Sequence, residues 1–529
     1  MKKILVTIAA ILSLCTCTSS CSLINPKEPV DTQSKGGIEG NPLDTNVELT
    51  LYTGGAYNLK DDEIRNNIIE KLNDLSRTSI GVTIRLAYTD STEMQPLWKD
   101  DVPDIMVATG IFDMIYNANM ASGYVSKNTL VSYYNEKYID EVSEYINEKT
   151  PYLSLFYTKF PAFRDVCMVD GKQVGIAIPE SYVFNVPVFA VQKSVAREFI
   201  HDYENITDIK TALDLCKEIM DRRNDESRKM YATVPYILLS LIETEDYYDI
   251  FWNLSRMYFV KYNDPDNRIY RLDETELPDK IFEKKKELME YSFKTDMNDL
   301  IKDINKNAVD AFILDGIRLL DSYDRECPTL LEDYVFYPMY DSVLRNRRMS
   351  YFTVSAACEE KQLALMYIDW LFSNDEARKF IGYGIEGVNY NFDQQTKTIY
   401  YSDDVRPVSL ISIGTGNNFS TIGNSVFGSV NEAAYYKEKV YERYEPDYMA
   451  DIINQITDYE AFIKDVDKFL RNESHLEQIQ LESGLKRSVL TFAFDDKTTE
   501  ASLINYFKSL EDTNNPLFTK ALESLFFDR

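Results

Sequence analysis

The sequence predicts an α/β fold built around an open, mostly parallel sheet. Residues 47–52 alternate apolar and polar side chains, which is typical of a strand. Isoleucine and leucine then recur at helical spacing from Ile64 to Leu75, and a second alternating strand follows at residues 82–86. A strand, a helix and a strand in this order form the repeating unit of parallel sheets, in which ligands bind at the carboxyl ends of the strands.

The length and composition of the chain predict a globular protein of several domains. Its 529 residues are 44% hydrophobic and 13% aromatic, and a chain of this length exceeds the usual size of one hydrophobic core. The part that follows residue 46 therefore fits two or three domains.

The start of the chain resembles the export signal of a bacterial lipoprotein. A pair of lysines precedes an apolar run at residues 4–14, which is too short to span a bilayer. Three cysteines follow this run. Cys21 comes after the small residues 18–20 and is the predicted site of lipidation, while Cys15 and Cys17 are alternatives. Acyl chains at one of these cysteines would hold the protein stably on a membrane.

Residues 22–46 are predicted to form a flexible tether between the lipid and the folded body. They contain few residues to bury and are punctuated by proline and glycine.

The net charge of −29 argues against nucleic acid as a partner, because phosphates need a basic surface that this chain does not offer. The same acidity disfavours electrostatic binding to anionic lipids. It says nothing about the identity of a ligand.

The motifs of the common enzyme classes are missing from the sequence. The chain has two histidines, His201 and His475, and neither lies near a serine or cysteine in a nucleophile elbow. It lacks a Walker-type phosphate loop, and residues 414–416 are one glycine short of a dinucleotide-binding turn. A glycosidase with a pair of carboxylates stays open, because 86 acidic residues make any pairing uninformative. We therefore predict a protein that is not an enzyme and uses no cofactor.

The cysteines of the body are widely spaced and form no Cys-x-x-Cys motif of a metal or redox site. We expect buried free thiols and no metal site. These cysteines are Cys167, Cys216, Cys327 and Cys358.

Two loops after strands are predicted to line the mouth of a ligand site. Residues 53–57 follow the first strand and include Tyr57, and residues 88–90 follow the second strand. Any strand needs a loop after it, so these positions are candidates by location only. Trp98 precedes the strand expected after Pro103, and it either stacks on a ligand ring or packs in the core or rim of the fold.

The second half of the chain contains a segment dense in aromatic residues, at 247–259, which includes Trp252. This segment is either a buried aromatic-rich helix or a surface on which a ligand ring stacks. The three lysines at residues 284–286 are expected to lie on the solvated face of a helix.

Arg345, Arg347 and Arg348 form a basic cluster just before a strand expected at residues 351–354. They either form surface salt bridges or bind an anionic or hydroxylated ligand through a guanidinium group.

Three motifs follow one another along the chain. The first is Pro-Asp-Ile at residues 103–105, and the second is Asp-Gly-Lys-Gln-Val-Gly at residues 170–175, a tight turn before a strand that Pro179 ends. The third combines an amphipathic helix at residues 363–371 with Tyr-Gly-Ile-Glu-Gly-Val-Asn-Tyr at residues 383–390. With these motifs the chain resembles the Gram-positive lipoprotein branch of extracellular solute-binding protein family 1, whose members are lipid-anchored substrate-binding components of ABC importers.

The resemblance implies a two-lobed, periplasmic-binding-protein-like fold of type II with a hinged cleft. The chain would cross to the second lobe after Pro179, and Tyr383 and Tyr390 would be packed supports of the hinge. The implied domains are a signal peptide at residues 1–21, a tether at 22–46, lobe one at 47–178 with 350–410, and lobe two at 179–349 with 411–529.

The resemblance also implies a lipid-anchored extracellular protein on the outer face of the cytoplasmic membrane of a Gram-positive bacterium. As a monomer it would capture an oligosaccharide in the cleft and deliver it to the permease subunits of an ABC transporter. Aromatic side chains supply faces that stack on sugar rings, and tyrosine adds a hydroxyl that bonds to them. The predicted ligand-binding residues are Tyr57, Trp98, Tyr182, Phe184, Trp252 and Arg348.

Three alternatives stay open. They are an oligopeptide-binding lipoprotein of an importer or sensor system, a surface protein without a role in transport, and a surface carbohydrate-active enzyme.

Overall fold

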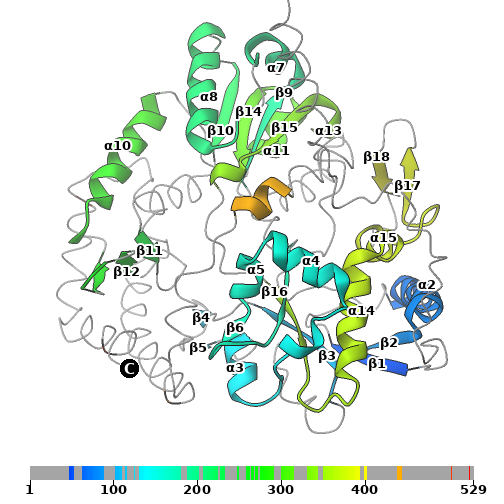
Figure 1. The fold of residues 1–529 in the computed structure, drawn as a ribbon. Coiled ribbons are helices and arrows are strands. Elements are labelled where there is room, and N and C mark those ends of the chain that lie inside the picture. Colours follow the sequence, from blue (N-terminus) through cyan, green and yellow to red (C-terminus); the bar gives the residue numbers. More distant parts are fainter. Residues whose placement is uncertain are drawn as a thin grey trace, which may run out of the picture. The chain divides into compact units, whose positions relative to one another are not determined.

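The computed structural model describes part of the chain (Figure 1). Every described residue belongs to the unit formed by residues 45–529. The predicted signal peptide, Cys21 and the tether lie outside the described residues. The described residues are 47–52, 62–87, 102–109, 114–115, 124–125, 130–179, 187–201, 206–223, 225, 227–232, 247–249, 258–261, 264–266, 268–271, 274–290, 299–314, 330–342, 350–393, 398–401, 438–443, 461, 502 and 524.

A five-stranded sheet, called sheet 1 here, has the strand order β2-β1-β3-β16-β8. The strand β1 pairs in parallel with β2 and β3, and β16 is antiparallel to its neighbours β3 and β8. Four of the five strands run in one direction, as the predicted mostly parallel sheet requires, although two of the four strand pairings, those of β16, are antiparallel. Its strands are β1 (Val47–Tyr52), β2 (Val82–Ala87), β3 (Ile105–Thr109), β8 (Ile176–Ile178) and β16 (Ser350–Val354).

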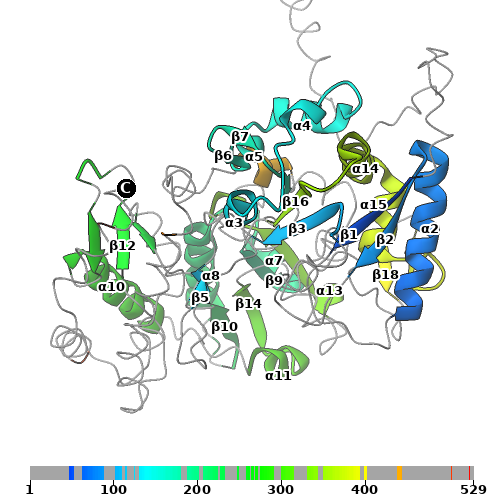
Figure 2. The same ribbon diagram turned by 90° about the horizontal axis from the view of Figure 1, so that it is seen from below.

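The helix α2 (Asp62–Ile80) packs against β2, and Figure 2 shows it lying alongside β1 and β2. Its buried stripe includes Ile68 and Leu72, as the helical spacing of apolar residues predicts. The side chain of Asn73 donates to the carbonyl of Ile84 and accepts from its amide, both at 2.8 Å. This pair of bonds fixes the helix to the strand that follows it.

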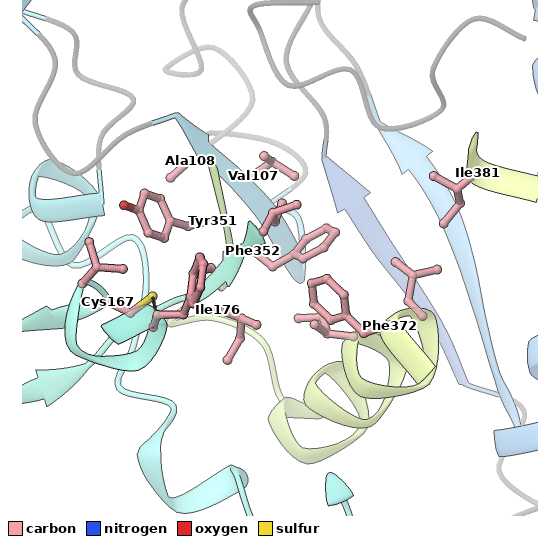
Figure 3. Packing of buried hydrophobic residues seen from close by; sticks show 14 of the residues in the cluster. Val107, Ala108, Cys167, Ile176, Tyr351, Phe352, Phe372 and Ile381 are labelled. Carbon is pink, nitrogen blue, oxygen red and sulfur yellow. Dashed lines mark hydrogen bonds between the residues drawn. The ribbon is translucent and has the colours of Figure 1, made fainter. Parts of the chain in front are cut away.

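Alternate residues of β16 enter different parts of the core (Figure 3). Tyr351 lies near Ala108 and Cys167, whereas Phe352 faces Phe372, with ring centroids 5.9 Å apart. Phe372 belongs to a helix that includes the amphipathic stretch predicted at residues 363–371. That helix is α14 (Lys361–Ser373), and α15 (Asp375–Tyr383) follows it with the Asn374 side chain as its N-cap.

A four-stranded sheet, called sheet 2 here, has the order β10-β14-β9-β15, in which β9 is antiparallel to β14 and β15. One face packs against α7 and α8 through a separate hydrophobic cluster that includes Phe189 and Cys216. Its elements are β9 (Val188–Gln192), α7 (Lys193–Phe199), α8 (Ile209–Arg223), β10 (Lys229–Ala232), α11 (Leu300–Asn305), β14 (Val309–Leu314), α13 (Leu330–Asp333) and β15 (Tyr334–Pro338).

The aromatic segment at residues 247–259 begins and ends in strands, so the interpretation as one helix is wrong at both ends. A small antiparallel sheet contains β11 (Tyr247–Asp249), β12 (Tyr258–Lys261) and β13 (Ile269–Arg271). The Tyr247 and Phe259 rings meet edge to face across it, with centroids 6.4 Å apart. This cross-strand pairing of aromatic rings stabilises strands more than a helix.

The predicted solvated lysines lie on α10 (Leu277–Glu290). Lys286 is exposed, but Lys285 is only 6% exposed, and its ammonium lies 5.8 Å from the Phe282 ring centroid. The prediction was wrong for Lys285, because consecutive residues of a helix point about 100° apart, so three in a row do not share one face.

Shorter elements complete the described structure. Within the described part of the chain, no helix has the length and apolar character that a membrane span needs.

Three cysteines of the body, Cys167, Cys216 and Cys358, are free and buried as expected, and Cys327 lies outside the described residues. The remaining elements are β4 (Met114–Ile115), β5 (Tyr124–Val125), α3 (Leu130–Asn135), η4 (Ser143–Tyr145), α4 (Pro151–Lys159), α5 (Ala162–Asp165), β6 (Met168–Val169), β7 (Lys172–Gln173), η8 (Tyr340–Ser342), β17 (Tyr390–Asp393) and β18 (Thr398–Tyr401).

Candidate ligand-binding site

The carboxyl ends of the parallel strands define one edge of sheet 1. Thr109 ends β3 and pairs with Ser350, which begins the antiparallel strand β16. Ser350 also pairs with Ile178, the last residue of β8. The chain therefore leaves sheet 1 after Ile178 and returns to it at Ser350 along the same edge.

Sheet 2 has a matching edge. Leu314 and Pro338, the last residues of β14 and β15, both pair with Val188, the first residue of β9. The chain thus enters sheet 2 at the edge where its neighbouring strands end. It leaves this edge after Pro338.

Two crossings of the chain connect these two edges, one from Ile178 to Val188 and one from Pro338 to Ser350. Open α/β sheets bind ligands outside the carboxyl ends of their strands, where loops carry polar groups. Each crossing therefore connects the carboxyl edge of sheet 1 to the carboxyl edge of sheet 2, and these edges are where the two sheets would bind a ligand. We take the joined edges as the candidate site.

The six ligand-binding residues predicted from the sequence all lie outside the described residues. Sequence adjacency nevertheless links four of them to the candidate site. Tyr57 follows the end of β1, Tyr182 and Phe184 belong to the first crossing, and Arg348 belongs to the second. Trp98 precedes β3 and Trp252 follows β11, so adjacency links neither residue to the joined edges.

The Pro-Asp-Ile motif has a structural role. The Asp104 carboxylate accepts a hydrogen bond from the Thr50 amide at 2.8 Å, and the Asp104 amide donates to the Thr50 carbonyl at 2.9 Å. The Asp104 carbonyl accepts from the Ser355 amide at 2.9 Å. Asp104 therefore fixes β3 between β1 and β16, at the end of β3 away from the candidate site.

The Asp-Gly-Lys motif forms the turn of a hairpin between β6 and β7. Asp170 and Gly171 both have positive φ, at 52° and 74°, as a two-residue hairpin turn of type I′ requires. The predicted tight turn is confirmed. Gly175 ends the motif at a position with little room for a side chain, because a Cβ atom there would lie 2.8 Å from Leu130 Cδ1.

The Tyr-Gly-Ile-Glu-Gly motif forms the end of α15 and a compact loop. Gly384 has a φ of 83°, and the fully buried Asn389 side chain accepts from the Ile385 amide at 2.8 Å. Tyr390 is 4% exposed, and burial raises the pKa of its phenol to about 12. Its burial agrees with a packing role, whereas the Tyr383 side chain lies outside the described residues.

The sequence analysis missed Tyr340, a partly exposed aromatic residue at the candidate site. It follows β15, at the start of the second crossing, and both neighbouring amides are fixed. Met339 donates to the Pro187 carbonyl and Asp341 to the Thr207 carbonyl, each at 2.8 Å. An aromatic residue directly after an apolar strand was the available signal, but no strand was predicted at residues 334–338.

The main buried ion pairs of sheet 2 lie at the opposite edge. Asp310, near the start of β14, is 2% exposed and pairs with Arg223 at 2.7 Å and with Arg228. Hydrogen bonds from Lys229 and Tyr231 lower the pKa of the Asp303 carboxyl. Among the described residues, no group of three or more His, Cys, Asp or Glu side chains is placed to hold a metal ion.

Solved structures with a similar fold are solute-binding proteins. The N-glycan transport solute binding protein from Streptococcus pneumoniae has a TM-score of 0.52 at 13% identity, over 91% of this chain and 98% of that chain. Its complex with Man1GlcNAc has a TM-score of 0.46 at 13% identity, over 91% and 99% of the two chains. An S. pneumoniae ABC-transporter substrate binding protein in complex with kestose has a TM-score of 0.43 at 12% identity, over 90% and 98%.

The first of these similarities confirms the predicted fold, the two-lobed α/β fold of solute-binding proteins. All three neighbours are binding proteins, and identities this low show the fold alone. No family model matches the chain, and no match is found among curated proteins.

Proposed function

We propose that this protein is an extracellular solute-binding protein that captures an oligosaccharide and delivers it to an ABC importer. The observation that carries the proposal is the pair of crossings that joins the carboxyl edges of sheets 1 and 2. The fold similarity to an N-glycan transport solute binding protein supports the ligand class and the role in transport.

In this proposal each sheet is the core of one lobe, and the ligand contacts both carboxyl edges. A ligand that touches both lobes favours the closed state, because it binds that state more tightly than the open one. Residues on one lobe would contribute to the first, weaker encounter. The proposed lobes are residues 47–178 with 350–410 and residues 179–349, and residues 438–443 contact elements of both.

The residues near the two edges suit a sugar better than an anion or a metal. Tyr340 offers an aromatic face, and the sequence has further aromatic residues, Tyr57, Tyr182 and Phe184, in the segments that follow β1 and β8. Such faces stack on the apolar faces of pyranose rings, and phenol hydroxyls bond to sugar hydroxyls. The role is binding without chemical conversion of the ligand.

The proposed location follows from the amino-terminal sequence. Cys21 would carry the acyl chains that hold a monomer on the outer face of the cytoplasmic membrane, with residues 22–46 as the tether. The permease subunits would then meet the folded body near the membrane surface.

A thermal-shift screen of residues 45–529 tests the proposal. The panel contains oligosaccharides and, as a second arm, short peptides. A ligand present at a hundred times its dissociation constant stabilises the folded state by about 2.7 kcal/mol, which raises the melting temperature measurably. A shift with one glycan series supports the proposal. A shift with peptides alone, or with neither arm, contradicts it.

A further inference from the structure

A short helical segment at residues 438–443, drawn in orange in Figure 1, contacts the elements around sheet 1 at one end. Tyr441 is 6% exposed and meets three rings edge to face, one on α4, one at the C-cap of α4 and one on α5. Glu438 forms an ion pair with Lys159 at the end of α4. The centroid distances from Tyr441 are 5.9 Å to Phe156, 5.6 Å to Phe160 and 5.5 Å to Phe163.

The other end of this segment contacts the carboxyl edge of sheet 2. The Arg443 guanidinium lies 2.7 Å from Asp341 Oδ1. Asp341 is the neighbour of Tyr340, and its other carboxylate oxygen accepts from the Thr207 hydroxyl at 2.6 Å. Arg443 is therefore connected, through one carboxylate, to the backbone that carries Tyr340.

The two attachments differ in strength. Tyr441 is buried among rings, and each aromatic contact of this kind adds to the stabilisation that burial alone provides. The side chains of Arg443 and Asp341 are 59% and 29% exposed, and an exposed ion pair is weak and screened by salt. Breaking the ion pair between Arg443 and Asp341 therefore costs less free energy than separating Tyr441 from α4 and α5.

We infer that residues 438–443 form a strap, permanently attached to α4 and α5 through Tyr441 and releasably attached to sheet 2 through the Arg443–Asp341 ion pair. Arg443 is thereby a positioning residue for Tyr340 and for the carboxyl edge of sheet 2. The strap is defined by contacts within the protein, so only the effect of the strap on ligand binding rests on the proposed function.

Hydrogen–deuterium exchange of the full chain, measured without ligand, tests the strap. The variants are Arg443→Ala, Arg443→Lys and the control Arg77→Ala. Arg77 is a matched arginine, 51% exposed and paired with Asp74 at 3.0 Å within α2. The amides to follow are those of Met339 and Asp341, together with the amides of α4 and α5.

We expect Arg443→Ala to accelerate exchange at Met339 and Asp341 about two- to fivefold, the range that an exposed ion pair supports. Wild-type protein in 1 M salt should show the same acceleration, because the Debye length there is about 3 Å. Arg443→Lys, which keeps the charge, should stay near the wild-type rate, as should Arg77→Ala. The amides of α4 and α5 should not change in any of these variants.

Tyr441→Ala should accelerate exchange in α4, in α5 and at Asp341, because both attachments would then fail. Unchanged rates at Met339 and Asp341 in Arg443→Ala would overturn the inference, and so would equal acceleration in α4 and α5. Since no sugar is present, these results are independent of whether the protein binds an oligosaccharide.

Discussion

Tyr340 is an aromatic residue at the carboxyl edge of sheet 2 that packs against the core and is partly exposed, and the amides on both sides of it are hydrogen-bonded. We expect Tyr340→Ala to weaken oligosaccharide binding by about 1 kcal/mol, the scale of one aromatic contact beyond its area. Titration calorimetry with a sugar identified by the thermal-shift screen measures this loss.

The control for this variant is Tyr351→Ala, since Tyr351 is 1% exposed in the core. Truncating a large buried aromatic residue costs about 3–5 kcal/mol of stability, so the melting temperature of the ligand-free protein should fall far more in Tyr351→Ala than in Tyr340→Ala. Unchanged affinity in Tyr340→Ala would remove Tyr340 from the site.

The Asp369 carboxylate on α14 is 5% exposed and accepts from the Leu153 amide at 2.8 Å, in the first turn of α4. Burial raises the pKa of this carboxyl from 3.8 to about 6 in the folded protein. The stability associated with this shift is fully present below about pH 4 and is lost as the pH rises through 6. Its size is on the order of 2–3 kcal/mol.

We therefore expect the free energy of unfolding of the wild type to fall between pH 4 and pH 7 relative to that of Asp369→Asn, which cannot ionise. Urea unfolding of both proteins at the two pH values measures the difference. Asp375→Asn, at an exposed position at the start of α15, serves as the control. Parallel pH profiles for wild type and Asp369→Asn would contradict the expectation.

At the scale of elements, the end of α15 offers a matched pair of glycines. Gly384 and Gly387 have nearly equal positive φ, 83° and 81°, and Gly384 has a ψ of −141°, so alanine strains the backbone of both, at a cost on the order of 1–3 kcal/mol each. A Cβ atom at Gly384 would lie 2.5 Å from Asn389 Oδ1, whereas at Gly387 it would meet nothing within 4 Å.

Gly384→Ala should therefore destabilise the protein by a further 1–3 kcal/mol or so compared with Gly387→Ala, the usual cost of overpacking. Denaturant unfolding of the two variants gives the comparison directly. Equal losses would mean that the Asn389 side chain moves aside without cost.

Sequence patterns predicted the elements whose apolar residues recur regularly. The strand at residues 47–52, the helix that contains Ile68 and the helix at residues 361–373 each bury one continuous stripe, so period alone identifies them. The segment at residues 247–259 was misinterpreted as a helix, although aromatic residues are enriched in strands, because the strand that pairs with each end cannot be identified from the segment itself.

The candidate site was harder to predict from the sequence than the fold. The motif residues that carried the resemblance, such as Asp104, Gly171 and Gly384, fix turns and strand ends. They identify the fold because backbone geometry demands them, and this role gives no information about which side chains contact a ligand. The position of Tyr340 depends on β15, which precedes it, and on the hydrogen bond from the Met339 amide to the Pro187 carbonyl. The residues around Tyr340 in the sequence do not predict a contact with a residue so distant in the chain.

At the scale of the whole molecule, sheet 1 depends on a strand from a distant part of the chain. β16 lies between β3 and β8 in the sheet order, although β8 ends at Ile178 and β16 begins at Ser350. We expect a chain truncated after residue 349 to lack cooperative unfolding of sheet 1, because β3 and β8 would lose the strand between them.

Near-ultraviolet circular dichroism and urea unfolding of the truncated chain measure this loss. Adding residues 350–529 as a separate fragment is the control, since it supplies β16 in trans. A sharp unfolding transition of full amplitude in the truncated chain alone would show that sheet 1 forms without β16.

The position of β16 also sets an order of events during synthesis. All four described strands of sheet 2 leave the ribosome before residues 350–354 do. Until then β3 and β8 lack β16, the strand that pairs with both of them. Long-range pairing of this kind is slow to form. For an exported chain, as its amino-terminal sequence predicts, this order would delay the completion of sheet 1 until residues 350–354 have been synthesised.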